Sequence, residues 1–310
     1  MDESMEITVL GGYGVGKTMY LDRYPEPGET VTGGEYREGP GGKASNQAIQ
    51  IRRLGAAANL ITAVGNDSGA ALGRDLWLSE GVNTDGVVVL DAPTMVGFIS
   101  VDSNGDNRIA IAPGALAQMT VANVEALYPV IDRSAALVVS FELNPLVGFE
   151  AIRHARKQGI TSVCNPAPAT EIPDDVLCCI DYLVPNLSEA AQIAGALGAD
   201  PREPADIARY LLGRGVGTVI ITLGAKGVYL DDGGGGAFLP AVWANKVVDT
   251  TGAGDSFLGA FTSALVKGAQ TSEAVSYAMR VAAITVEGAE VVPSLPYAES
   301  LTEKSGMGND

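Results

Sequence analysis

The chain has 310 residues, 46% of them hydrophobic and 6% aromatic, which predicts a globular protein with a sizeable core built around one main domain. Its 37 acidic and 20 basic residues give a formal net charge of −17, and such a surface repels phosphate groups, which argues against nucleic acid or a membrane as partner. The single histidine, His154, excludes Ser-His-Asp triads and multi-histidine zinc sites, and its polar neighbours predict a solvated side chain.

The N-terminal segment is not expected to target the chain to a membrane or for export. Residues 1–6 are acidic where a secretory signal is basic, and no apolar run approaches the ~20 residues of a membrane span. Cys178 and Cys179 are neighbours, a spacing that suits neither a structural disulfide nor a metal site, and Cys164 is the third cysteine. The sequence therefore predicts a reduced, cytoplasmic protein.

Compact apolar runs alternate with helical patterns along the chain. The apolar runs predict parallel strands covered on both faces at residues 7–10, 136–140, 161–164, 182–184 and 218–222. Apolar residues at helical spacing predict helices at residues 46–54, 145–158, 188–197 and 205–212. The alternation predicts a doubly wound α/β sheet with helices on both faces.

Residues 11–18, GGYGVGKT, match the P-loop pattern directly after the first expected strand. A P-loop needs a helix after its Lys-Thr pair so that the helix N-terminus caps the phosphates, but the YPEPG segment at 24–28 ends any helix within two turns. The best candidate for a strand that ends in a magnesium-binding Asp, 137–141, is followed by Glu142 instead. The sequence therefore argues against a P-loop NTPase.

Two segments interrupt the alternation of strands and helices. Residues 13–38 contain the turn at 24–28, and residues 94–112 contain a hairpin turn at 103–106 between apolar runs. We predict that these segments form extra strands of a small β lid on a single domain that spans residues 1–310.

A glycine-rich turn, PGGKASNQA at residues 40–48, leads into the helix expected at 46–54. It offers Lys43 and Asn46 as polar groups on a rigid element, an arrangement that suits the hydroxyl groups of a sugar. The alternative is a plain loop with an Asn helix cap.

The segment DTTGAGDSF at residues 249–257 carries the strongest functional signal. Gly252, Ala253 and Gly254 allow the backbone to approach a ligand, and the apolar run after them predicts a buried helix whose first N–H groups face an anion. Asp255 then lies in the first turn, where a carboxylate takes a proton from an attacking hydroxyl. The alternative is an Asp cap after a glycine turn.

Together these segments resemble the PfkB, or ribokinase-like, family of carbohydrate kinases. Its first signature matches Gly41 through Asn46, Gly55 and Gly65, and its second matches residues 249–261. Further similar segments are GDNRI at 105–109, PGA at 113–115, NPAPA at 165–169, PNLSEA at 185–190 and TLGAKG at 222–227.

The resemblance covers about residues 6–297. It implies a ribokinase-like fold, a doubly wound and mostly parallel sheet with a small β lid, and ATP-dependent phosphorylation of a hydroxymethyl group. It implies Asp255 as general base, with the amides of Gly252, Ala253 and Gly254 as an anion hole. The implied substrate-binding residues are Gly42, Lys43, Asn46, Glu142, Gly14 and Gly16. The implied nucleotide-binding residues are Asn186, Glu189, Thr222, Gly224, Lys226, Gly227 and Met279.

The resemblance also implies metal ions at this site. Asn186 and Glu189 match an element that organises Mg²⁺ and phosphate, although Glu189 is equally a favourable charge in the first turn of a helix. Asp249 and Thr251 match a monovalent-cation site, which predicts K⁺ bound with backbone carbonyls around Ala283, Val286 and Gly288.

The sequence departs from the ribokinase pattern at the sugar. Gly14 and Gly16 stand where ribokinases carry an Asn-x-Asp pair that binds sugar hydroxyls. Losing a partner for a buried hydroxyl costs about 1–3 kcal/mol per group, which argues against ribose. The added space favours a larger acceptor, a hexose derivative or a nucleoside, with Lys17 or Tyr13 as new contacts. Met279 replaces the usual Asn or His beside the adenine, and its apolar side chain suits stacking.

We expect a sugar kinase, with a nucleoside kinase of the same family or a non-catalytic sugar-binding regulator as alternatives. The intact Asp255 disfavours the regulator. Lid sheets in ribokinase-like proteins often pair across a two-fold axis, and the exposed strand edges predict a homodimer here. The expected partners are therefore ATP, a small-molecule substrate and a second copy of the chain.

Overall fold

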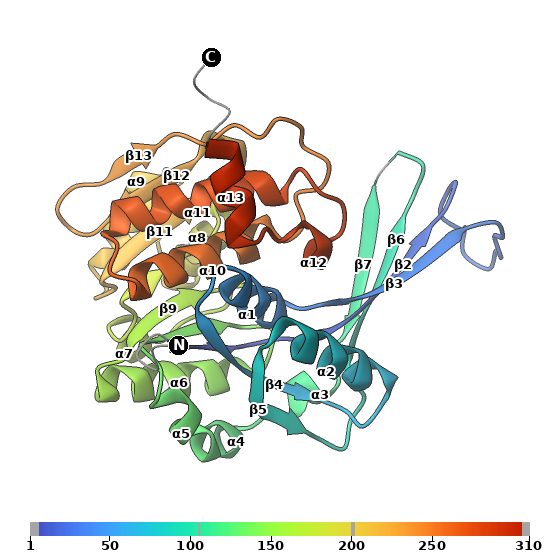
Figure 1. Ribbon diagram of the computed structural model, residues 1–310, viewed down its shortest axis with the longest axis horizontal. Coiled ribbons are helices and arrows are strands. Elements are labelled where there is room, and N and C mark those ends of the chain that lie inside the picture. Colours follow the sequence, from blue (N-terminus) through green and yellow to red (C-terminus); the bar gives the residue numbers. More distant parts are fainter. Residues whose placement is uncertain (1–5, 105, 200–201, 306–310) are drawn as a thin grey trace.

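The fold is built around a sheet of nine strands (Figure 1). The computed structural model describes residues 6–104, 106–199 and 202–305. The strand order is β13-β12-β11-β10-β9-β8-β1-β4-β5. The strands are β1 (Glu6–Leu10), β4 (Ala57–Val64), β5 (Asn83–Val89), β8 (Ala136–Ser140), β9 (Thr161–Asn165), β10 (Tyr182–Leu183), β11 (Thr218–Thr222), β12 (Val228–Asp231) and β13 (Ala237–Leu239). Only the pairs β11–β12 and β12–β13 are antiparallel, so the sheet is mostly parallel.

Helices cover both faces of this sheet. One layer contains α1 (Lys43–Arg53), α2 (Ser68–Glu80), α10 (Ala253–Val266), α11 (Thr271–Thr285), α12 (Val291–Ser294) and α13 (Ala298–Ser305). The other contains α4 (Val121–Ala126), α5 (Tyr128–Ile131), α6 (Pro145–Gln158), α7 (Asp174–Leu177), α8 (Leu187–Ala196) and α9 (Pro204–Leu212), with the short α3 (Ala115–Gln118).

Side chains of the central strands alternate between the two helix layers. On β1, Val9 belongs to the core beneath α1 and α10, whereas Leu10 belongs to the core beneath α6. On β11, Ile220 and Ile221 divide in the same way. Continuous apolar strands are therefore buried on both faces, as the sequence predicts, and the doubly wound α/β fold is confirmed.

A second, four-stranded sheet projects from the main body in the order β3-β2-β6-β7. Its strands are β2 (Gly14–Tyr20), β3 (Glu35–Gly41), β6 (Met95–Val101) and β7 (Asn107–Ala112). The two interrupting segments of the sequence therefore do form extra strands, and β3 extends past residue 38. The predicted hairpin turn includes Gly105, which lies outside the described residues.

Two expectations about single elements need correction. The helix expected from Asn46 begins at Lys43, because the preceding Gly42 adopts a φ of 97° and turns the chain into the helix. His154, expected to be solvated, is buried on α6, where its ring stacks on Tyr128 with centroids 3.5 Å apart and its Nε2 lies 2.6 Å from Asp132 Oδ1. In the described part of the chain, no helix has both the length and the apolar surface to cross a membrane.

The P-loop pattern does not form a P-loop. Residues from Gly14 onward form β2 rather than a phosphate-capping helix. Lys17 pairs across the strand with Glu38, with the Nζ and Oε2 atoms 3.5 Å apart. The structure therefore excludes the NTPase interpretation that the sequence already disfavoured.

Replacing Lys17 with Ala tests this conclusion. We expect K17A to bind ATP with wild-type affinity in isothermal titration calorimetry, because the side chain lies in a partly exposed ion pair of the small sheet. Its free energy of unfolding should fall by less than about 1 kcal/mol, the usual value of such a pair. Loss of ATP binding with the fold intact would restore the P-loop interpretation.

Candidate active site

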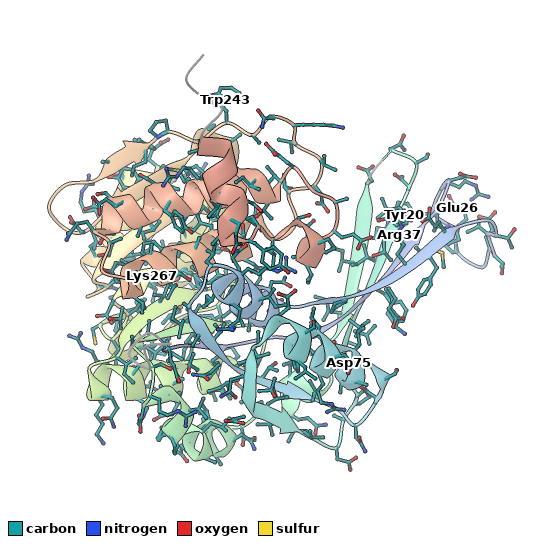
Figure 2. The ribbon with its side chains drawn as sticks, in the orientation of Figure 1. Tyr20, Glu26, Arg37, Asp75, Trp243 and Lys267 are labelled. Atoms are coloured by element: carbon teal, nitrogen blue, oxygen red, sulfur yellow. The ribbon has the colours of Figure 1, made fainter. Side chains whose placement is uncertain are left out.

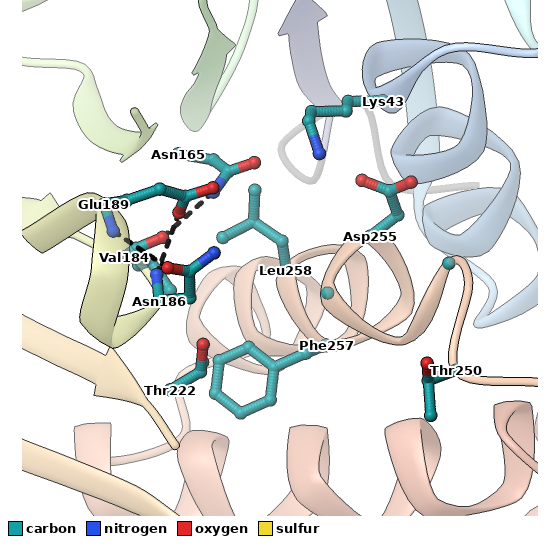
Figure 3. A pocket seen from close by; sticks show the side chains of 12 residues that line it. Lys43, Asn165, Val184, Asn186, Glu189, Thr222, Thr250, Asp255, Phe257 and Leu258 are labelled. Carbon is teal, nitrogen blue, oxygen red and sulfur yellow. Dashed lines mark hydrogen bonds between the residues drawn. The ribbon is translucent and has the colours of Figure 1, made fainter. Parts of the chain in front are cut away.

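A cavity of about 230 Å³ opens where α1 and α10 begin, beside the ends of β10 and β11 (Figure 3). Its lining residues are Lys43, Asn165, Val184, Asn186, Glu189, Thr222, Thr250, Gly252, Gly254, Asp255, Phe257 and Leu258. The side chains of Lys43 and Asp255 point toward each other on one side, and Asn186 with Glu189 lies across from them. Segments distant in the sequence thus meet in one cavity.

The N-terminus of α10 presents its backbone to this cavity. Gly252 precedes the helix with a φ of 82°, and a Cβ there would lie 2.5 Å from Val291 Cγ1, so both conformation and space require glycine. A Cβ on Gly254 would meet no atom within 4 Å, so the backbone there is open to a ligand. Ala253 is the first helical residue, and the first N–H groups of a helix favour an anion.

Both carboxylate oxygen atoms of Asp255 accept hydrogen bonds from side chains of α1. Its side chain is 8% exposed; Asn46 Nδ2 donates to Oδ2 at 2.8 Å and Gln47 Nε2 donates to Oδ1 at 3.1 Å. Burial raises the pKa of Asp255 above its ordinary value, against the lowering effects of Lys43 and of the two amides. The carboxylate is thus oriented and made more basic than an exposed aspartate.

Lys43 and Glu142 extend the site toward the small sheet. The backbone N–H of Lys43 donates to Glu142 Oε2 at 2.6 Å. Burial acts to lower the pKa of Lys43, but the charges of Asp255, Glu142 and Glu189 outweigh it, so that its pKa is raised. Burial also raises the pKa of Glu142 to about 7, which Lys43 opposes. The lysine therefore stays charged among carboxylates.

Asn186 and Glu189 begin α8 as a reciprocal cap. Glu189 N–H donates to Asn186 Oδ1 and Asn186 N–H donates to Glu189 Oε2, both at 2.9 Å. The pair therefore serves as a helix cap, and it lines the cavity as well; the alternative that the sequence indicates for Glu189 is a first-turn charge. Thr222, at the end of β11, lines the same side of the cavity. Its N–H donates to Pro185 C=O at 2.9 Å, which holds the end of β11 next to the start of α8.

Several predicted nucleotide residues lie outside the cavity lining. Gly224 and Lys226 form a short 3₁₀ turn closed by Gly227, whose C=O accepts from Leu223 N–H at 2.8 Å, and Lys226 is exposed. Met279 is partly buried on α11 and packs against the core beneath it.

The predicted cation-site residues form a local turn ahead of α10. Asp249 Oδ1 accepts from both Thr251 N–H at 2.9 Å and Thr251 Oγ1 at 2.7 Å. Val286 C=O accepts from the N–H groups of Val248 and Asp249 at 2.8 and 3.3 Å. The two segments that the resemblance assigns to K⁺ are therefore in contact. Asp249 Oδ1 and Val286 C=O, two of the oxygen atoms in these segments, already accept hydrogen bonds within the chain.

Gly14 and Gly16 lie at the start of β2, beside the turn that precedes Lys43. The two replacement contacts suggested for the substrate are corrected by the structure. Tyr13 is fully buried, with its hydroxyl donating to Gly69 C=O at 2.8 Å. Lys17 points to the other face of β2 from Gly16 and pairs with Glu38.

The sequence pattern did not single out Gln47, which holds Asp255, or Asn165, which lines the cavity. Gln47, which binds Asp255, follows Asn46 directly and has only its amide as a signal. Asn165 follows β9 and donates through Nδ2 to Val184 C=O at 3.0 Å. Its position at the carboxyl end of a parallel strand is the signal that would have found it, because ligands bind at that edge of such sheets.

Comparison with known proteins places this geometry in a family. A family model described as pfkB family carbohydrate kinase matches residues 14–297. The ribokinase of Haemophilus influenzae is 35% identical over 96% of this chain and 97% of its own length. The bifunctional ribokinase/ribose-5-phosphate isomerase A of Fructilactobacillus sanfranciscensis is 34% identical over 96% of the chain, which spans 55% of that protein's length.

A solved structure has the same fold. The ribokinase of Arabidopsis thaliana, solved in complex with ribose and ATP, superposes with a TM-score of 0.87 and 27% identity, covering 96% of this chain and 97% of that one. The similarity extends over both sheets, because nearly the whole chain is covered.

Replacing Glu142 with Gln should change how stability depends on pH. The folded chain holds a proton on Glu142 up to about pH 7, against an ordinary pKa of 4.5, so it binds this proton more tightly than the unfolded chain does. The wild-type free energy of unfolding should therefore lose up to about 3 kcal/mol from this group as pH rises from 4.5 to 7.

The E142Q protein keeps an oxygen for the Lys43 N–H and should lack that loss in urea unfolding across this pH range. Replacing the exposed Glu125 with Gln is the control and should follow the wild type. Parallel pH profiles for E142Q and wild type would show that Glu142 does not titrate as described.

Proposed function

Because the chain belongs to the pfkB family of carbohydrate kinases, we propose that it transfers the terminal phosphoryl group of ATP to a hydroxymethyl group of a sugar or sugar-like substrate, with Asp255 as general base. The observation that carries the proposal is the buried Asp255 carboxylate in the first turn of α10, opposite Lys43 in the cavity.

Asp255 has the environment that a base requires. Its raised pKa increases its affinity for the hydroxyl proton, and the amides of Asn46 and Gln47 fix both of its oxygen atoms. The backbone at Gly252, Ala253 and Gly254 would stabilise negative charge on the phosphoryl group in transfer. The base and the anion hole therefore come from one helix end.

The other side of the cavity is suited to the nucleotide. Asn186, Glu189 and Thr222 line it, and we assign the turn at Gly224, Lys226 and Gly227 and the side chain of Met279 to ATP on the family resemblance. Among the described residues no three acidic, histidine or cysteine side chains cluster as a metal site. Mg²⁺ would therefore be held mainly by the phosphates and water, with Glu189 nearby, and would neutralise phosphate charge.

We also propose a K⁺ site at Asp249 and Thr251, supported by the contact between this turn and Val286. The free Cys164, Cys178 and Cys179 support the proposal of a cytoplasmic protein. For the acceptor, Glu142, Gly42, Lys43 and Asn46 supply polar groups, whereas Gly14 and Gly16 offer none. A nucleoside kinase is the second candidate because these glycines remove the polar contacts expected for a free pentose.

Replacing Asp255 with Asn tests the assignment of the base. The turnover number should fall by about 10²- to 10⁴-fold, because the amide cannot accept the proton, while ATP affinity stays within about twofold. ADP release measures the first and calorimetry the second. Replacing the exposed Asp75, on α2, with Asn is the control, and this variant should retain full activity (Figure 2).

Undiminished ADP release by D255N would show that Asp255 is not the base. A wild-type chain that binds ATP and sugars without releasing ADP would support the sugar-binding regulator instead.

We further propose that the chain forms a homodimer through the small sheet, which acts as a lid. Phe98, Tyr36 and Met19 lie on one face of this sheet with exposed fractions of 59%, 51% and 38%. The edge strands β3 and β7 also have unpaired backbone groups on one side. A second copy offers a matching face and matching edges across a two-fold axis.

Replacing Phe98 and Tyr36 with Asp together should shift the chain from dimer to monomer in light scattering after size exclusion. The expected shift follows from burying two charges in an apolar interface. Replacing Phe238 on β13, which is 64% exposed outside this sheet, with Asp is the control and should leave the mass unchanged. A wild-type monomer at micromolar concentration would contradict the proposal.

A further inference from the structure

The small sheet has one face directed toward α12 and the start of α10. Tyr13, just before β2, and Val15 on β2 point toward α2, where Val15 Cγ2 would lie 3.2 Å from a Cβ on Gly69. Successive side chains of a strand point to opposite faces, so Gly14 and Gly16 belong to the other face. We call this other face the inner face of the small sheet.

The inner face of the small sheet faces α12 and the start of α10. Arg37 is in register with Thr18 on this face, and its Nη1 lies 3.6 Å from Glu290 Oε1, just ahead of α12. The next residue, Val291, packs against Gly252 at the N-terminus of α10. Figure 2 shows Arg37 on the small sheet, and Figure 1 shows α12 beside β3. The inner face therefore borders the site of Asp255.

Three glycines stand side by side on the inner face. Gly16 of β2 is in register with Gly39 of β3 and with Gly97 of β6. A Cβ on Gly39 or Gly97 would meet no atom within 4 Å, and one on Gly16 would meet only Ile99 Cδ1 at 3.7 Å and Gly39 C=O at 3.8 Å. We call these residues the glycine row.

The backbone does not require glycine in this row. None of the three has a positive φ, and side chains would fit at all of them. Gly14 differs, because a Cβ there would lie 2.7 Å from the backbone oxygen of Met95. The glycine row therefore leaves open space above the sheet, although neither steric contacts nor backbone conformation requires glycine at these positions.

Isoleucines border the glycine row. Ile111 is in register with Gly97, and Ile99 with Ile109 occupies the next row. Ile109 and Ile111 are 58% and 61% exposed. The two inner strands, β2 and β6, are paired on both sides within the sheet, so the row offers a largely flat surface of C–H groups with an apolar border.

We propose that the glycine row binds a planar heterocyclic ring, so that the acceptor is a nucleoside; the inference rests on the proposed kinase function. A flat ring covers such a surface at van der Waals distance, whereas hydroxyl groups placed there would lose water without gaining partners. The sugar end keeps polar partners at the root of the sheet, because Asn46 Oδ1 is buried without a hydrogen bond and Glu142 lies beside Lys43.

Acceptor preference tests the proposal. Adenosine, cytidine, ribose, 2-deoxyribose and fructose are compared as acceptors by ADP release, with mass detection of the phosphorylated product. We expect kcat/KM for at least one nucleoside to exceed that for every free sugar by about tenfold or more. A free sugar that exceeds both nucleosides would overturn the proposal and leave the kinase function intact.

Filling the row provides a second test. In G97V, the branched side chain occupies the open space and suits a strand. We expect kcat/KM for nucleosides to fall about tenfold or more while that for ribose changes less than about threefold. Replacing Ser100 with Val places the same side chain on the other face of the same strand and should change neither value. An equal loss for all acceptors in G97V would overturn the proposal.

If no acceptor is phosphorylated, a binding measurement distinguishes failure of the proposed kinase function from failure of the glycine-row proposal. Equilibrium dialysis with radiolabelled adenosine is then carried out on wild type and G97V. Binding by wild type that G97V loses would support the glycine row and contradict only the kinase function. Absence of adenosine binding by the wild type would overturn the inference as well.

Discussion

The site depends on the burial of one carboxylate between two helices. Asp255 reaches Asn46 and Gln47 only because α1 and α10 pack closely, and Gly259 permits this approach, since a Cβ there would lie 2.9 Å from Gln50 Cβ and 3.1 Å from Gln47 C=O. A larger residue at Gly259 would separate the helices and remove both amide donors. The packing of the core therefore determines the position and the basicity of the proposed base.

The same constraint connects the two sheets. Gly42 starts α1 with a positive φ, and a Cβ there would lie 2.5 Å from Gly12 C=O, so the chain leaving β1 and the chain entering α1 touch at their backbones. A Cβ on Gly12 would likewise lie 2.5 Å from Glu142 Oε2. Glycines at these contacts bring Glu142, Lys43 and the root of the small sheet within one site.

Local sequence predicted those parts of the site that depend on local structure. The turn before Lys43 and the start of α10 were found because glycines and an apolar run mark a helix start. Local sequence does not predict the role of Gln47, because that role depends on how closely α1 and α10 pack, which no local pattern encodes. The P-loop pattern shows the reverse case: its letters match, but Lys17 lies in a strand paired with β3 and β6. His154 was misjudged because burial in the α6 layer outweighed its polar neighbours.

The proposed base and the proposed acceptor surface are located on different elements. Asp255 and the proposed anion hole lie at the start of α10, which packs into the core, whereas the glycine row lies on strands that leave the main body. A Cβ at Gly16, Gly39 or Gly97 would clash with no atom, so a side chain at these positions does not require the core to move. Substitutions in the glycine row can therefore change the proposed acceptor surface without moving Asp255.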